Sequence, residues 1–179
     1  MDKKLFYTEN FDTDLPRGKH YEQIVLNHLK KTDPNAYMTH GKDKRYDIYL
    51  PGLNFGIEVK YDEKSNDTGN ILIELEFPVG TYSGLNTTEA KYWVITDGKE
   101  YVIVKPEGIR AFASENNIKS VTKTGNGDSH PKLVWLFRKK DFFSRCKLLM
   151  DTTTGDWHEG ISNTQTEQEQ QAAWKALRT

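Results

Sequence analysis

The sequence predicts an α/β or α+β fold in which helices flank a mixed central β-sheet. Short segments with alternating apolar residues recur along the 179 residues, and segments with helical spacing of apolar residues lie between them. The length suits one domain, residues 1–150, followed by a polar C-terminal appendage, residues 151–179, with a possible terminal helix. The apolar content of 36% is low, but 8 Phe, 9 Tyr and 4 Trp provide enough large side chains for a core.

The first expected element is a helix from about Pro16 to Lys31, with Asp14 as its N-cap. Its apolar side chains form one arc, made of Tyr21, Ile24, Val25, Leu26 and Leu29. Glu22 falls inside this arc and not on the opposite, solvated side of the helix. A carboxylate on a packed face costs free energy unless something pairs with it, so Glu22 is a candidate functional residue.

A β-hairpin follows, in which residues 45–50 and 55–60 flank a turn at residues 51–54. If this loop is symmetric, Asp47 lies directly opposite Glu58 on one face of the hairpin. Lys60 is two residues beyond Glu58 and therefore points to the same face. The register alone thus brings three ionisable groups together.

The remaining pattern predicts further strands and short helices. They are a strand at 70–77, a loop and short helix at 84–91, a hairpin of 92–95 and 101–104 that turns at Asp97-Gly98, a helix from Pro106 to Asn116, a strand at 133–137 after a loop at 124–132, and a short helix from Asp141. A terminal helix is expected at about 167–177. These elements are expected to share one mixed sheet.

Composition excludes several classes of protein. A lone cysteine, Cys146, cannot form an intrachain disulfide and suits a reducing compartment, and structural zinc is not expected. No apolar run is long enough for a signal peptide or a membrane span, so we expect a cytoplasmic protein with no membrane partner. The net charge of -1 argues against a strongly basic coat, although local basic groups could contact nucleic acid: Lys42, Lys44, Arg45, Arg138, Lys139 and Lys140.

The acidic cluster has the chemistry of a metal site. Two carboxylates one strand apart, Asp47 and Glu58, suit Mg²⁺ or Mn²⁺, and the Val59 carbonyl could complete the shell. A metal there would polarise a phosphodiester and activate water, while Lys60 would stabilise the developing negative charge or help position and deprotonate the water. Glu22 would then have a role, and Glu74 on the next strand is a possible accessory acid.

These residues resemble the motif of the PD-(D/E)XK nuclease superfamily, which includes restriction endonucleases, Holliday junction resolvases and phage nucleases. The resemblance covers about residues 17–104. It implies a restriction-endonuclease-like core and hydrolysis of DNA phosphodiesters with Mg²⁺ or Mn²⁺. It also implies that Asp47 and Glu58 are metal ligands, Lys60 the catalytic lysine and Glu22 the accessory acid of the helix. Tyr46 replaces the name-giving proline.

The small size and the stretch Thr-Thr-x-Ala-x-Tyr-Trp at 87–93 favour a phage-type or homing-type endonuclease within the superfamily, in the host cytoplasm if phage-encoded. A small domain that cuts both strands needs two active sites, so a homodimer is expected, with DNA as partner and no small-molecule cofactor. Two other functions stay open: a structure-selective, junction-resolving nuclease, and a non-catalytic nucleic-acid-binding module with a nuclease fold. The plainest alternative is a solvated cross-strand charge cluster that contributes about 0.2–1 kcal/mol per pair.

Overall fold

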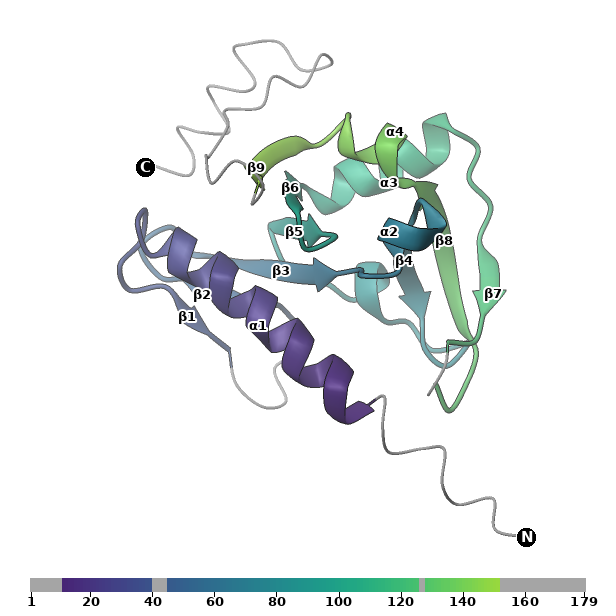
Figure 1. Ribbon diagram of the computed structural model, residues 1–179, viewed down its shortest axis with the longest axis horizontal. Coiled ribbons are helices and arrows are strands. Elements are labelled where there is room, and N and C mark those ends of the chain that lie inside the picture. Colours follow the sequence, from purple (N-terminus) through teal and green to yellow (C-terminus); the bar gives the residue numbers. More distant parts are fainter. Residues whose placement is uncertain (1–10, 40–44, 126–127, 152–179) are drawn as a thin grey trace, which may run out of the picture.

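The computed structural model describes residues 11–39, 45–125 and 128–151. Along the chain its elements are α1 (Phe11–Leu29), β1 (Tyr37–Met38), β2 (Ile48–Leu50), β3 (Phe55–Tyr61), α2 (Ser65–Thr68), β4 (Asn70–Glu76), η1 (Gly84–Asn86), β5 (Tyr92–Thr96), β6 (Glu100–Val104), α3 (Pro106–Glu115), β7 (Val121–Lys123), β8 (Lys132–Arg138), α4 (Lys139–Phe143) and β9 (Lys147–Asp151). They form a mixed α+β fold, as expected (Figure 1).

The central sheet has six strands in the order β1-β2-β3-β5-β6-β9. Strands β3 and β5 are parallel, and the other neighbours are antiparallel. A second, antiparallel sheet has the order β4-β8-β7. It stands on the side of β3 away from β1 and β2, and α1 crosses in front of the central sheet (Figure 1).

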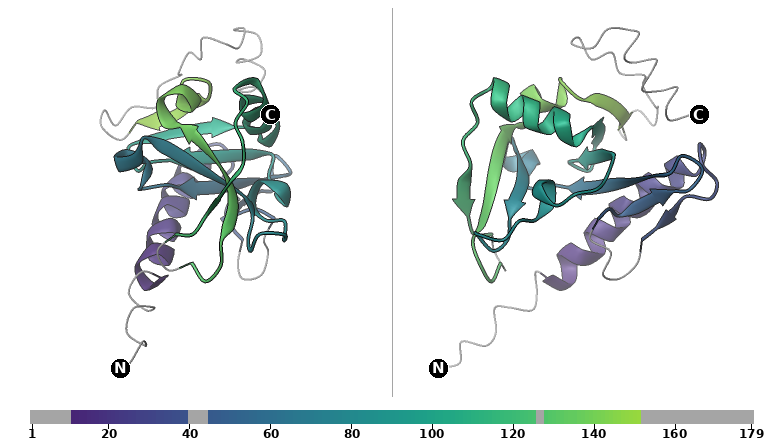
Figure 2. Two further views of the ribbon diagram at one scale, coloured as in Figure 1. Left: turned by 90° about the vertical axis from the view of Figure 1, so that its right-hand side faces the viewer. Right: turned by 180° about the vertical axis from the view of Figure 1, so that it is seen from behind.

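The two faces of the central sheet pack into two separate hydrophobic clusters. On one face, α1 buries Val25, Leu26 and Leu29 against Ile48 and Ile57. On the other face, a second cluster joins the central sheet to α3, α4 and the second sheet, and it includes Trp93, Ile95, Ile71, Ile73, Phe112, Phe137 and Phe142. Figure 2 shows α1 and α3 on opposite sides of the sheet. Neighbouring residues of β3 therefore alternate between two different environments.

The register predicted for the first hairpin is confirmed. Ile48 pairs with Ile57 and Leu50 with Phe55, and this pairing ends at Ile48. The Asp47 N–H bonds to the Ile57 carbonyl, so Asp47 lies beside Glu58 and not directly opposite it as the register predicted. Strand β2 pairs with only the first three residues of β3, although β3 continues to Tyr61. The second half of β3 therefore has an edge that β2 does not cover.

The structure differs from the sequence prediction at the starts of two helices, in the number of sheets and in several short elements. Helix α4 begins at Lys139, so Asp141 lies inside it and not at its start. Helix α1 begins at Phe11, so Asp14 lies inside the helix and not at its start. The sequence placed the start near Pro16 because proline is best tolerated in the first turn. The expected single sheet is two sheets, because β4 pairs with β8 and an alternating pattern does not say which sheet a strand joins. The short elements β1, α2, β7 and β9 were not predicted.

The proposed domain boundary near residue 150 falls inside β9, since Asp151 pairs with Glu100. The predicted terminal helix at 167–177 lies outside the described residues. In the described part of the chain, no helix combines the length and the apolar character that crossing a membrane requires.

Candidate functional site

Asp47 lies where strand β2 separates from strand β3. Its backbone N–H donates to the Ile57 carbonyl at 3.0 Å, which is the last link of the hairpin. Its side-chain Oδ2 accepts a hydrogen bond from the backbone N–H of Val59 at 2.8 Å. The carboxylate thus takes the place that a backbone carbonyl of β2 would have, and it is fixed against the open edge of β3. The alternation of strand groups directs the Val59 carbonyl toward the same edge.

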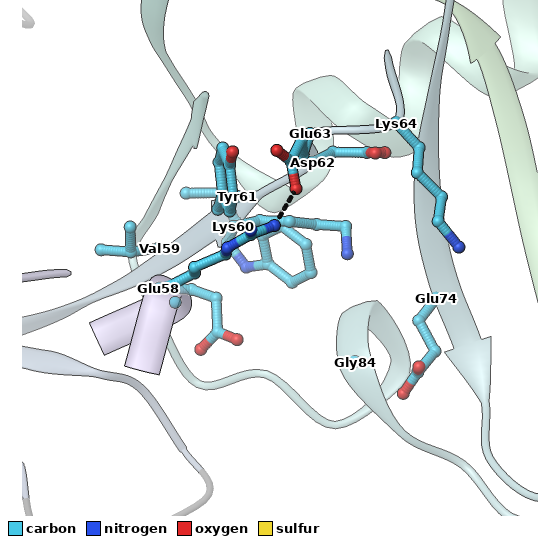
Figure 3. Close-up of a pocket in the computed structure, with 12 residues that line it drawn as sticks. Glu58, Val59, Lys60, Tyr61, Asp62, Glu63, Lys64, Glu74 and Gly84 are labelled. Atoms are coloured by element: carbon cyan, nitrogen blue, oxygen red, sulfur yellow. Dashed lines mark hydrogen bonds and ion pairs between the residues drawn. The ribbon is translucent and has the colours of Figure 1, made fainter. Parts of the chain in front are cut away.

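Glu58 and Lys60 project from the face of β3 that α1 does not cover, into a cavity of about 430 Å³. The cavity is bounded by the last residues of β3 and the segment after it, by Arg17 of α1, and by Glu74 and Gly84 near the second sheet. Glu58 and Glu74 approach this space from different sides (Figure 3). The register predicted from the sequence has therefore placed an acid and a lysine side by side on the wall of a cavity.

The acids of this cluster are electrostatically unsatisfied. Burial, then the neighbouring Asp47, raises the pKa of Glu58 to about 8, and Lys60 only partly offsets this. Burial also raises the pKa of Asp47, against the lowering effect of the Val59 N–H. In Glu22 the pKa is raised by burial and then by Asp47. Because Asp47 acts on both other acids, the structure brings Glu22, Asp47 and Glu58 into one electrostatic unit, as the sequence predicted.

Glu74 is more fully paired than these three acids. The Ser83 hydroxyl donates to its Oε1 at 2.7 Å, and the Lys132 ammonium lies 3.5 Å from its Oε2. Gly84 permits this arrangement because it has a φ of +48°, and a Cβ there would lie 2.5 Å from the Glu74 carbonyl oxygen. Glu74 adds to the negative charge around Glu58. Its own carboxylate is, however, already held by protein groups.

The arrangement fits a hard divalent cation with an open coordination shell. Among the described residues, no three His, Cys, Asp or Glu side chains are placed to enclose a metal by themselves. Mg²⁺ is commonly held by one or two carboxylates, with water and substrate phosphate as its other ligands. Asp47 and Glu58, with the Val59 carbonyl beside them, could supply such a partial shell. Their raised pKa values show that the ionised forms are costly in the metal-free protein, and a bound cation would offset that cost.

Several residues that line the cavity were not predicted from the sequence. Arg17 on α1 pairs with Glu63 at 2.6 Å and so bridges the helix to the segment after β3. Asp62 accepts the N–H of Leu72 at 2.9 Å, which ties the end of β3 to the second sheet. Lys64 lies beside Asp62 and Glu63 in the lining. For Asp62, Glu63 and Lys64, closeness to Lys60 in the sequence was the available signal, but without the second sheet it gave no reason to expect a cavity. For Arg17 on α1, the sequence offered no such signal.

The candidate nucleic-acid contacts have varied surroundings. Lys42 and Lys44 lie outside the described residues. The structure describes the other four candidates. Arg45 lies 3.9 Å from Glu89, and Arg138 lies 3.8 Å from Asp141. Lys139 is bound to the buried Asp97 at 2.9 Å, and Lys140 is exposed. Lys139 is therefore engaged inside the protein, whereas Lys140 and Arg138 face solvent.

Neither a family model nor a curated protein nor a solved structure matches the chain.

Proposed function

We propose that this chain is a metal-dependent endonuclease of the PD-(D/E)XK type that hydrolyses DNA phosphodiester bonds. One observation carries the proposal: the Asp47 carboxylate is fixed by the Val59 N–H at the edge of β3, where it acts electrostatically on Glu58, and Lys60 shares the face of Glu58. A solvated charge cluster would not require a backbone N–H to hold one acid in place. It would also not bury the acids against one another enough to raise the pKa of Glu58 to about 8.

Each residue of the site would have a different role in the proposed hydrolysis. Asp47 and Glu58, with the Val59 carbonyl, would hold Mg²⁺ or Mn²⁺, which supplies Lewis-acid polarisation of the phosphate when bound. Lys60 points into the same cavity, where its ammonium would offset the negative charge that develops on the phosphate. Glu22 reaches the cluster from α1 and would orient water through its carboxylate. The cavity supplies room for the phosphate and its flanking sugars.

The proposed partner is DNA, and the proposed active form is a homodimer, because one such site cuts one strand. We also propose a cytoplasmic location. Cys146 is a free, buried thiol, and burial raises its pKa, so it is in its neutral form and suits a reducing compartment.

The test is cleavage of supercoiled plasmid and of a four-way junction in Mg²⁺ or Mn²⁺, with wild type beside Asp47→Asn and Lys60→Ala. We expect wild type to cut and each variant to lose at least about a hundredfold in rate while still binding DNA. Lys119→Ala is the matched control, because Lys119 is an exposed lysine that does not line the cavity and is not among the candidate nucleic-acid contacts. It should cut at the wild-type rate.

Equal cutting by all four proteins would contradict the assignment of the site. If all four bind DNA and none cuts either substrate, the non-catalytic binding module replaces the nuclease. A marked preference of wild type for the four-way junction over the plasmid would identify the junction-resolving form of the same chemistry.

A further inference from the structure

Three tyrosines form a row on the face of the sheet opposite α1: Tyr37 in β1, Tyr49 in β2 and Tyr46 just before β2. Tyr37 and Tyr49 have ring centroids 5.8 Å apart, and Tyr49 and Tyr46 have centroids 5.5 Å apart with nearly parallel planes. We call these three residues the tyrosine row. It lies on the side of the strands opposite α1, because the alternate residues Met38, Ile48 and Leu50 pack into the cluster beneath α1.

The tyrosine row leads directly to the acidic site. Tyr37 pairs with Tyr49, and Tyr49 pairs with Gly56, so Tyr37, Tyr49 and Gly56 share one face of the sheet. Gly56 has no side chain, and the Tyr46 ring occupies the space where a Cβ would stand. Glu58 is the next residue of β3 on that face. The row therefore ends one step from the cavity.

Burial does not account for the ring of Tyr37, whereas Tyr49 is half-buried and Tyr46 is partly buried against the second hydrophobic cluster. Tyr37 is 50% exposed although it lies on the edge strand of the sheet, where soluble proteins usually place charged or polar side chains. In Figure 2, the view from behind places β1 and β2 in front of α1, so this face is turned away from the helix. The Arg45 guanidinium lies 5.4 Å from the centroid of the Tyr46 ring, which places a cation at the site end of the row.

We propose that the tyrosine row is a stacking platform for unpaired bases of a nucleic-acid strand, which it directs toward Glu58 and Lys60. Aromatic side chains bind successive bases without sequence preference because every base has a π-face, and a cation beside them attracts the backbone. The substrate class that follows is a single-stranded or branched nucleic acid and not an uninterrupted duplex. This inference rests on the proposed nuclease function for the direction of the strand, but the binding itself does not require cleavage.

The test measures affinity in EDTA for a fluorescein-labelled oligo-dT of about twenty nucleotides and for a duplex of equal length. We expect Tyr37→Ala and Tyr49→Ala each to weaken binding of the single strand by about five- to a hundredfold, and to leave duplex binding unchanged. Tyr37→Phe keeps the ring and should bind like wild type. Tyr82→Ala is the matched control, because Tyr82 is 70% exposed but pairs with Glu76 beside the second sheet.

Unchanged single-strand binding in both alanine variants would overturn the platform, and so would an equal loss in Tyr82→Ala. Thermal melting of every variant checks that it is folded. Tyr46 is left intact because its ring packs on Gly56. Sedimentation of the same proteins tests the competing occupant: if the alanine variants lose self-association and not single-strand affinity, the row is an interface between two copies, and the proposal is wrong.

The platform and the nuclease function can fail separately. Cleavage that is lost in Lys60→Ala, combined with tyrosine variants that bind single strands normally, would keep the nuclease and remove the platform. Absence of cleavage in wild type, combined with tyrosine-dependent single-strand binding, would keep the platform and remove the nuclease.

Discussion

Asp97 and Asp47 both stand at the end of a strand, Asp97 just after β5 and Asp47 just before β2, but their surroundings differ. Asp97 receives the Lys139 ammonium at 2.9 Å and the N–H groups of Lys99 and Glu100 at 2.8 Å each. Burial alone would raise the pKa of Asp97, but these donors lower it below its ordinary value. Asp47 receives one N–H and has other acids for neighbours, and its pKa is raised.

This difference separates a structural acid from a candidate functional one. The charge of Asp97 is neutralised by groups from β6 and from α4, so the carboxylate joins parts of the chain that are far apart in sequence. At Asp47 and Glu58 the described protein groups only partly offset the cost of ionising the two acids, so the pKa of each stays raised. A protein that tolerates such a cost at one place, beside a cavity, leaves that place ready for a ligand from outside.

The largest expected effect comes from breaking the satisfied pair. Lys139→Met leaves the buried Asp97 without its counter-charge, and we expect it to lower the free energy of unfolding by about 3 kcal/mol. Denaturant unfolding measures this, with Lys140→Met as the matched control on the exposed neighbour. Equal stability of the two variants would show that Asp97 does not depend on Lys139.

Glu58 and Asp97 should affect the free energy of unfolding in different pH ranges. The pKa of Glu58 rises from 4.5 to about 8 on folding, so the metal-free fold binds its proton more tightly than the unfolded chain does. The stabilisation that Glu58 gives to the fold is therefore fully present below about pH 4.5 and is lost as the pH rises toward 8. The free energy of unfolding falls by at most about 1.4 kcal/mol per pH unit over this range. The pKa of Asp97 is lowered, so its contribution is lost only as the pH falls below its ordinary value of 3.8.

Unfolding curves in EDTA between about pH 5 and pH 8.5 test this sign. Glu58→Gln should flatten the loss of stability toward high pH, and Asp97→Asn should not. A metal-free wild type that becomes more stable across this range would show that Glu58 is ionised in the folded protein.

The smallest expected effect has the opposite sign to that of Lys139→Met. Asp47→Asn removes one of two facing carboxylates but keeps an oxygen that can accept the Val59 N–H. In the metal-free protein at pH 8 we expect it to raise the free energy of unfolding by about 0.2–1 kcal/mol. Denaturant unfolding beside wild type measures the change. A destabilisation of the size expected for Lys139→Met would place Asp47 among the structural acids.

The sequence predicted the part of the site that depends on local pairing. A four-residue turn and alternating apolar residues were enough to pair Ile48 with Ile57, and this register is confirmed. It brings Asp47 beside the second half of β3, where its side chain bonds to the Val59 N–H. The position of Glu22 within an apolar arc indicated that its carboxylate faces the core side of α1, where Asp47 raises its pKa. Both inferences use neighbours within one or two elements, for which the period of the pattern is sufficient.

The sequence could not predict what depends on distant pairing. The second sheet forms because β4 pairs with β8, about sixty residues away, and the alternating pattern of β4 suits either sheet equally. The cavity between Glu58 and Glu74 exists only because of that sheet. The pairing of Lys139 with Asp97 is of the same kind, so a residue predicted to contact nucleic acid is bound within the fold.

The most direct test of the account is a titration of the protein with Mn²⁺, followed by electron paramagnetic resonance of the free ion. We expect wild type to bind Mn²⁺, Asp47→Asn and Glu58→Gln each to weaken this binding by at least about tenfold, and Asp97→Asn to bind like wild type. Mn²⁺ binding that persists unchanged in both Asp47→Asn and Glu58→Gln, or that is lost in Asp97→Asn alone, would contradict a metal site at Asp47 and Glu58.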